Sequence, residues 1–177
     1  TGIHGSRYAN HVVHDIEGLE LAAISRRSEE GRVQAAQWKC DWYRDWQHLV
    51  ADEQVEAVIS VVPPALNLAI ARSCASFNKP LLIEKPLADT SASAAEIVEL
   101  YRKRNLPLTI GQTLRYNQVI KTFKEKLPAL GTLHSFSANQ RLEPSTLLWH
   151  EQPDLAGAGV SFHTAVHVFD SLRYITC

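Results

Sequence analysis

Two charged residues, Glu84 and Lys85, directly follow the apolar run Leu81 to Ile83 and stand before Pro86. Proline has no N–H for a sheet ladder and restricts the residue before it to an extended backbone, so the pattern indicates a strand that ends at these charges. Because X–Pro bonds tolerate the cis form, we expect Lys85–Pro86 to be cis or to turn sharply. Taken alone, the two charges could also be ordinary exposed residues at a strand end.

A second polar group, His163, His167 and Asp170, recurs at i, i+4 and i+7 and would share one face of a helix. The adjacent apolar stripe, expected to pack inward, is Phe162, Val166 and Phe169. Imidazole suits acid–base catalysis near neutral pH. Two histidines one turn apart can also bind zinc, but Thr164 stands where a zinc peptidase helix carries Glu, so we predict no metal. Polar residues at a domain boundary are the remaining alternative.

The chain opens with Gly2 and Gly5, spaced like the last two glycines of a G-x-G-x-x-G turn. Such a turn lets backbone N–H groups approach a pyrophosphate at a helix N-terminus. Two glycines at this spacing are also common in plain turns, so this motif alone is weak evidence for a dinucleotide site.

The residues expected to read the adenosine ribose are Ser25, Arg26 and Arg27, which close an apolar run about 20 residues after the glycines. An acidic residue there would favour NAD, whereas guanidinium groups suit the oxygens of a 2′-phosphate. This run therefore favours NADP. The alternative is a solvated arginine pair beside Glu29 and Glu30.

These motifs must be positioned by strands that alternate with helices. The predicted strands are residues 19–25, 55–62, 80–85 and 106–112, and helix-length segments lie between them. That alternation predicts an α/β fold with a doubly wound parallel (Rossmann) sheet in residues 1–114. Residues 115–177 read as the beginning of an α/β substrate domain, with an exposed-faced strand across 131–142.

Composition limits the possible partners. The 177 residues are 45% hydrophobic, enough for a packed core, and carry a net charge of −1 without runs of like charge. This excludes an electrostatic footprint for nucleic acid or an anionic membrane, and a small, weakly charged partner fits better. The apolar stretch 57–71 is broken by prolines and polar residues and cannot span a membrane. Three cysteines without a C-x-x-C pair suggest reduced thiols and a cytoplasmic protein.

Five segments in order resemble the glucose–fructose oxidoreductase/inositol dehydrogenase/rhizopine-catabolism family: TGIHG (1–5), VVPPALN (61–67), IEKPLA (83–88), GQTLRYN (111–117) and LAGAGVSFHTAVHVFD (155–170). The resemblance implies an NADP- or NAD-dependent oxidoreductase that transfers a hydride between the nicotinamide and a sugar, polyol or related carbonyl compound. A non-catalytic dinucleotide-binding sensor of the same fold is the alternative. Family members are longer, so we expect the first strand and the C-terminal half to lie outside this chain, and the full-length protein to be a homo-oligomer.

The resemblance also implies roles for individual residues. Catalysis would rest on Lys85, His167 and His163. The residues expected to bind the cofactor are Gly2, Ile3, His4, Gly5, Ser25, Arg26, Arg27, Pro63, Pro64, Asn67, Glu84 and Lys85. Those expected to bind the substrate are Arg115, Asn117, Trp149 and Asp170. Two positions depart from the family pattern, since His163 replaces an Asp and Asn67 stands where many members have His.

Overall fold

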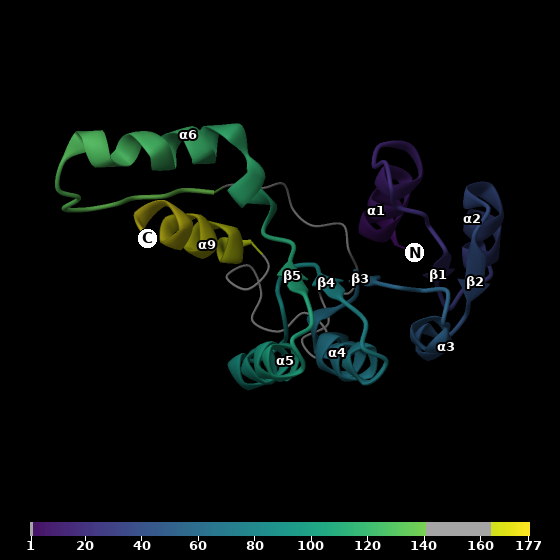
Figure 1. Cartoon of the computed structure of the whole chain (residues 1–177). Helices are drawn as coiled ribbons and strands as arrows, with labels where there is room; N and C mark the ends of the chain where they lie inside the picture. The colour runs from purple at the N-terminus through teal and green to yellow at the C-terminus, as the bar shows by residue number, and fades with distance from the viewer. Residues whose placement is uncertain (1, 141–163) are drawn as a thin grey trace.

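The structure is a computed structural model that describes residues 2–140 and 164–177 (Figure 1). Its strands are β1 (Ala23–Ser25), β2 (Asp41–Tyr43), β3 (Val58–Ser60), β4 (Leu81–Ile83) and β5 (Leu108–Ile110). Its α-helices are α1 (Ile3–His14), α2 (Glu30–Trp38), α3 (Trp46–Ala51), α4 (Asn67–Ser76), α5 (Ser91–Arg104), α6 (Gln118–Lys126) and α9 (Ala165–Thr176). Short 3-10 helices are η1 (Pro64–Leu66), η2 (Thr113–Tyr116) and η3 (Leu127–Leu130).

All strand pairs described are parallel, as the alternation of strands and helices predicted. β3, β4 and β5 form one sheet in that order, with Val58 opposite Leu81 and Leu81 opposite Leu108. β1 and β2 form a second sheet, with Ala23 opposite Asp41. Figure 1 shows α3, α4 and α5 along one side of the strands and α1 and α2 along the other. Helices on both faces are the doubly wound arrangement of a Rossmann fold.

A groove of about 1710 Å³ separates the two sheets. Residues of β1 and β3 line it along their length, and Gly2 and Gly5 of α1 line it as well. Among the described strands, none lies between β1 and β3. The groove extends along the whole of both strands and over buried apolar residues such as Val12 and Val50, so most of its volume is space between two strand edges. The start of α1 and the carboxyl end of β1 form part of its lining.

The hydrophobic core lies between the β3–β5 sheet and helices α4 and α5. Ile83, Cys74, Ile97 and Tyr101 are at most 1% exposed. Burying an aliphatic or aromatic side chain of this size stabilises a fold by about 1.5–3 kcal/mol. The Tyr101 hydroxyl donates to the carbonyl of Lys79 at 3.3 Å. This packing holds β4 to its last residue, Ile83, and so fixes the point at which Glu84 and Lys85 leave the sheet.

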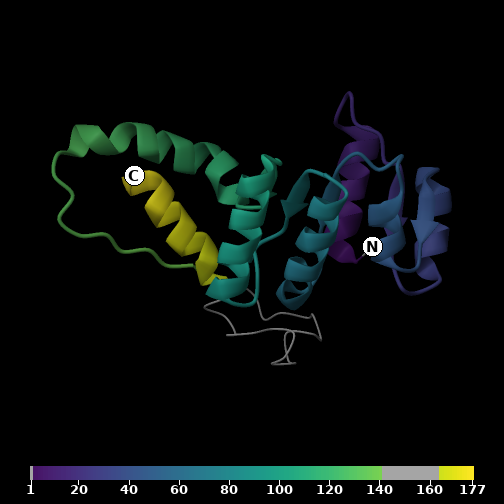
Figure 2. The ribbon, with the colours of Figure 1, turned by 60° about the horizontal axis from the view of Figure 1, so that its bottom comes forward.

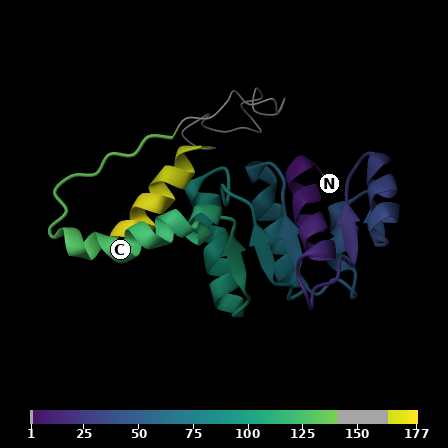
Figure 3. The same ribbon diagram turned by 90° about the horizontal axis from the view of Figure 1, so that it is seen from above.

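The last described part of the chain forms a helical unit that packs on η2, after β5. Helices α6 and α9 lie side by side at the end of the molecule away from α2 (Figures 2 and 3). Lys124 of α6 donates to the carbonyl of Tyr174 of α9 at 2.5 Å and lies 4.5 Å from the centre of its ring. The predicted domain boundary after residue 114 falls inside η2.

Two local predictions about this part were wrong. Residues 131–140 form no strand, because their described neighbour is helix α6, where Phe123 contacts Phe136, and no described strand pairs with them. Phe169, predicted to pack inward, is 65% exposed, because α9 contacts α6 and η2 through another face.

None of the helices in the described ranges has the length and the hydrophobicity that crossing a membrane requires.

Candidate active site

The glycine turn precedes a helix, as predicted. Gly2 is the N-cap of α1 and its carbonyl accepts from the N–H of Ser6 at 2.9 Å. Gly2 has no side chain to cap the first turn, so the backbone N–H groups of Ile3 and His4 remain at the positive end of the helix dipole. Gly5 lies one turn along the helix, is buried, and lines the groove with Gly2. This geometry suits a pyrophosphate.

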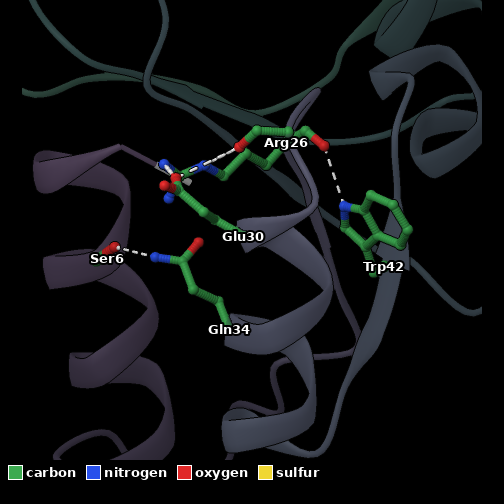
Figure 4. A network of polar contacts seen from close by, with 6 residues as sticks. Ser6, Arg26, Glu30, Gln34 and Trp42 are labelled. Carbon is green, nitrogen blue, oxygen red and sulfur yellow. Dashed lines mark hydrogen bonds and ion pairs between the residues drawn. The ribbon is translucent and has the colours of Figure 1, made fainter.

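The predicted ribose-reading residues lie at the carboxyl end of β1, and all three line the same groove: Ser25, Arg26 and Arg27. The side chain of Arg26 is engaged within the protein (Figure 4). Its Nε donates to the hydroxyl of Ser28 at 2.9 Å, and its Nη2 forms an ion pair with Glu30, the first residue of α2. Arg27 is exposed.

The turn after β3 holds Pro63, Pro64 and Asn67. Pro63 lines the groove, and Pro64 begins η1. Asn67 is 1% exposed, and its side-chain atoms all bond within the protein. Its Oδ1 accepts from the hydroxyl of Ser60 at 3.1 Å, and its Nδ2 donates to the carbonyl of Leu87 at 3.1 Å. Asn67 therefore connects the end of β3 to the turn that follows Lys85.

That turn contains the Lys85–Pro86 peptide bond, which is cis, so the prediction is confirmed. Glu84 accepts from the hydroxyl of Tyr8 at 2.6 Å through Oε1 and from the N–H of Lys85 at 3.0 Å through Oε2. Gly111 leaves space for this carboxylate, because a Cβ there would lie 3.1 Å from its Cδ. The Glu84 side chain is thus held against α1 and β5.

The charge of Lys85 acts on His167 although 82 positions separate the two residues in the sequence. Burial lowers the pKa of Lys85, and the negative charge of Glu84 opposes this. Burial also lowers the pKa of His167, and the positive charge of Lys85 lowers it further, while Glu84 and Asp170 oppose both effects. Charge effects of this kind fall with distance, so the helix start that carries His167 and the end of β4 share one electrostatic environment.

Three buried polar atoms in the described ranges have no hydrogen-bond partner: Nδ1 of His167, Oε1 of Gln112 and Oγ of Ser171. Gln112 follows β5 and precedes η2, and His167 and Ser171 lie one turn apart on α9, which packs against η2. Buried polar groups nearly always find a partner, so unsatisfied ones mark positions where a polar ligand could bond.

The expected substrate-binding residues are partly engaged with each other. Arg115 and Asp170 form a two-point ion pair, with nitrogen–oxygen distances of 2.8 and 2.6 Å. The side chain of Asn117 caps α6, accepting from the N–H of Val119 at 2.9 Å. Trp149 and His163 lie outside the described residues.

Two residues of the candidate site, Tyr8 and Glu30, were not predicted from the sequence. Tyr8 lies three positions after Gly5 on α1, and this spacing was the available signal that its side chain shares the inward face of the helix. Glu30 was treated only as a charge near Arg26. Within the described ranges, no group of three metal-ligating side chains comes together.

A family model described as an oxidoreductase family with an NAD-binding Rossmann fold matches residues 1–112. Inositol 2-dehydrogenase 1 of Saccharopolyspora erythraea is 28% identical over 185 residues, which cover 99% of this chain and 52% of that protein. Levoglucosan dehydrogenase of Pseudarthrobacter phenanthrenivorans is 27% identical over 138 residues, covering 74% of this chain and 35% of that protein.

Solved structures agree on the fold. The myo-inositol dehydrogenase of Lactobacillus casei in complex with NAD(H) and myo-inositol has a TM-score of 0.68 at 26% identity, covering 73% of this chain and 39% of that one. GenD2 from gentamicin A biosynthesis in complex with NAD has a TM-score of 0.86 at 22% identity, and the match covers 99% of this chain and 51% of that one. This chain spans about half or less of the length of these relatives.

Proposed function

Because this chain belongs to the oxidoreductase family with an NAD-binding Rossmann fold, we propose that it supplies the cofactor-binding part of a dehydrogenase that interconverts an alcohol and a carbonyl on a sugar, polyol or related compound. The observation that carries the proposal is the pair of polar groups, Lys85 in the cis-proline turn after β4 and the buried, unpartnered Nδ1 of His167, which the charge of Lys85 reaches. The relatives named inositol and levoglucosan dehydrogenase support this class of substrate.

Two parts of the groove lining would bind the cofactor. Gly2 and Gly5 line it at the start of α1, where a pyrophosphate is favoured by the helix dipole. Ser25, Arg26 and Arg27 line it at the end of β1, where the adenosine ribose belongs. When bound, the nicotinamide exchanges a hydride with the substrate carbon. We propose that NADP(H) is favoured over NAD(H), because Ser25 replaces an acidic residue and two guanidinium groups follow it.

Lys85 and His167 would handle the hydroxyl proton. As an ammonium, Lys85 stabilises the negative charge that develops on the substrate oxygen. Burial favours the neutral form of His167, so Nδ1, which lacks a partner among the described residues, is available to accept the hydroxyl proton in alcohol oxidation. Gln112 and Ser171 carry the other unpartnered buried atoms and would bond further hydroxyls of a polyol.

Residues from 115 onward would begin the substrate domain. Asp170 is held by Arg115, and its negative charge partly offsets the lowering of the pKa of His167. We assign Asp170, Arg115 and Asn117 to positioning the substrate or the residues that bind it. Trp149 and His163 belong to the same proposal.

The test is cofactor turnover by the full-length protein with a panel of polyols and keto-sugars. Lys85→Ala and His167→Ala should each lower kcat strongly and leave NADPH affinity within about twofold, because neither removes the glycine turn. The double variant should be little worse than the worse single one, as expected for residues that act as a unit. Lys103→Ala, at an exposed lysine of α5 that pairs with Glu99, is the matched control and should leave kcat unchanged.

Cofactor binding without turnover of any substrate in the panel would refute the dehydrogenase proposal. It would favour a dinucleotide-binding sensor. If the two losses in kcat multiply in the double variant, Lys85 and His167 act independently. That result would refute the shared site.

A further inference from the structure

The arginine expected to read a 2′-phosphate already has an anionic partner. Arg26 pairs through Nη2 with Glu30, and its Nε donates to Ser28 (Figure 4). The side chain of Arg26 is 29% exposed and that of Glu30 is 69% exposed, so the pair lies at the surface of the groove that Arg26 lines. A phosphate that binds Arg26 must therefore approach the carboxylate of Glu30.

The backbone holds these two residues together. The N–H of Arg26 donates to the carbonyl of Tyr43 at 3.1 Å, and its carbonyl accepts from the indole Nε1 of Trp42 at 3.0 Å. Gly31, next to Glu30, permits the close approach of α2, because a Cβ there would lie 2.4 Å from Nε1 of Trp42 and 2.8 Å from the Cβ of Arg26. Glu30 is thus kept beside Arg26 by the packing of α2 against both strands of the first sheet.

The same helix is tied to the glycine turn. Gln34 of α2 donates to the hydroxyl of Ser6 on α1 at 3.2 Å (Figure 4). One turn further along, the indole Nε1 of Trp38 donates to Asn10 of α1 at 2.9 Å. These contacts fix the position of Glu30 relative to the start of α1, and therefore relative to a pyrophosphate bound there.

We propose that Glu30 sets how strongly the protein discriminates NADP(H) from NAD(H). This rests on the proposed function, because it assumes that the groove binds a nicotinamide dinucleotide. A 2′-phosphate brings negative charge toward Glu30 and competes with it for Arg26, whereas an unphosphorylated ribose does neither. Glu30 thereby limits the preference for NADP(H) that Arg26 and Arg27 would otherwise create.

Glu30→Gln tests this, with Glu29→Gln as the matched control. Glu29 is the preceding residue, carries the same charge and is exposed, but it pairs with Arg44 rather than Arg26. Both changes remove one negative charge from the start of α2, and only one removes the partner of Arg26. Dissociation constants for NADPH and NADH are measured by fluorescence titration, at low salt and at 0.5 M salt.

We expect Glu30→Gln to raise the ratio of NADPH to NADH affinity about fivefold, the size of an exposed charge interaction near a surface. Glu29→Gln should change the ratio less than twofold. The gain should shrink at 0.5 M salt, because screening weakens exposed charges. In an Arg26→Ala background, Glu30→Gln should have little further effect on the ratio, because the competition for Arg26 is gone.

Equal shifts for Glu29→Gln and Glu30→Gln would overturn the inference, since the effect would then be general charge near the groove. An undiminished gain in the Arg26→Ala background would overturn it as well. Both results leave the dehydrogenase proposal intact. Failure of the parent protein to bind either dinucleotide would instead refute the proposed function, and the inference with it.

Discussion

Asn67→Ala should destabilise the fold through the loss of a buried amide that joins two parts of the candidate site. The side chain is 1% exposed, and its partners are the Ser60 hydroxyl and the carbonyls of Pro86 and Leu87, at 3.1, 3.4 and 3.1 Å. The 3.4 Å contact is long and weak. Alanine keeps the helix start and removes the amide, so the result reports the loss of the amide bonds together with the small cavity that the truncation leaves.

The expected magnitude follows from these contacts. A net hydrogen bond contributes about 0.5–1.5 kcal/mol, and a buried group left without a partner costs about 1–3 kcal/mol. Ser60 is 4% exposed, so its orphaned hydroxyl has little access to water. We expect Asn67→Ala to lower the free energy of unfolding by about 3 kcal/mol, and Ser60→Ala, which removes one bond, by about 1 kcal/mol. The double variant should resemble Asn67→Ala, because the shared bond is lost only once.

Urea unfolding followed by far-UV circular dichroism measures these differences. With a slope of about 2 kcal/mol per molar urea, a loss of 3 kcal/mol moves the midpoint by about 1.5 M. Gln37→Ala, an amide deleted from an exposed position of α2, is the control and should stay within about 0.5 kcal/mol. A loss below about 0.5 kcal/mol for Asn67→Ala, or fully additive losses in the double variant, would refute this account of the buried amide.

Three further changes test the site. Tyr8→Phe removes the 2.6 Å bond to Glu84 and should lower the free energy of unfolding by about 1–2 kcal/mol in the same urea assay; an unchanged midpoint would mean that Tyr8 does not anchor this carboxylate. Because burial lowers the pKa of His167 below its ordinary 6.5, kcat/KM for alcohol oxidation should stay level through pH 7 and fall only below pH 6.5, as the imidazole gains a proton. His167→Asn should abolish that acidic limb, and a limb that survives belongs to another group. Burial raises the pKa of Cys74 to about 12, so at pH 8 a disulfide reagent should label exposed Cys177 in the folded protein and Cys74 only after unfolding, with mass spectrometry assigning the sites; early labelling of Cys74 would contradict its burial.

Four strands could be predicted from the sequence because parallel strands buried on both faces appear as short apolar runs. β2 was missed. Asp41–Tyr43 contains a carboxylate and two aromatic residues, too short a run to show a period. It becomes a strand because it pairs with β1, a cause that lies in the neighbouring strand and not in its own three residues.

The cis bond before Pro86 could be predicted because its cause is local. The partner of Glu84 could not, since Tyr8 lies 76 positions away on α1 and meets Glu84 only in the folded chain. The pair of Arg115 and Asp170, 55 positions apart, depends in the same way on the docking of α9 against η2. Side-chain type therefore indicated which chemistry to expect, and packing decided which atoms remain available for it.

The two arginines that we assign to ligand binding, Arg26 and Arg115, differ in how strongly their carboxylate partners hold them. Arg26 and Glu30 form a partly exposed ion pair, and such pairs are weak enough for a doubly charged phosphate to compete with. Arg115 holds a carboxylate with 12% exposure through two bonds, and a neutral polyol brings no charge to exchange for it. We therefore expect Arg26 to contact its ligand directly and Arg115 to act through Asp170. Arg115→Lys, which keeps the charge and loses the two-point geometry, should then alter KM for the polyol and leave cofactor affinity unchanged. A loss of cofactor affinity as large as the change in KM would contradict this division of roles between Arg26 and Arg115.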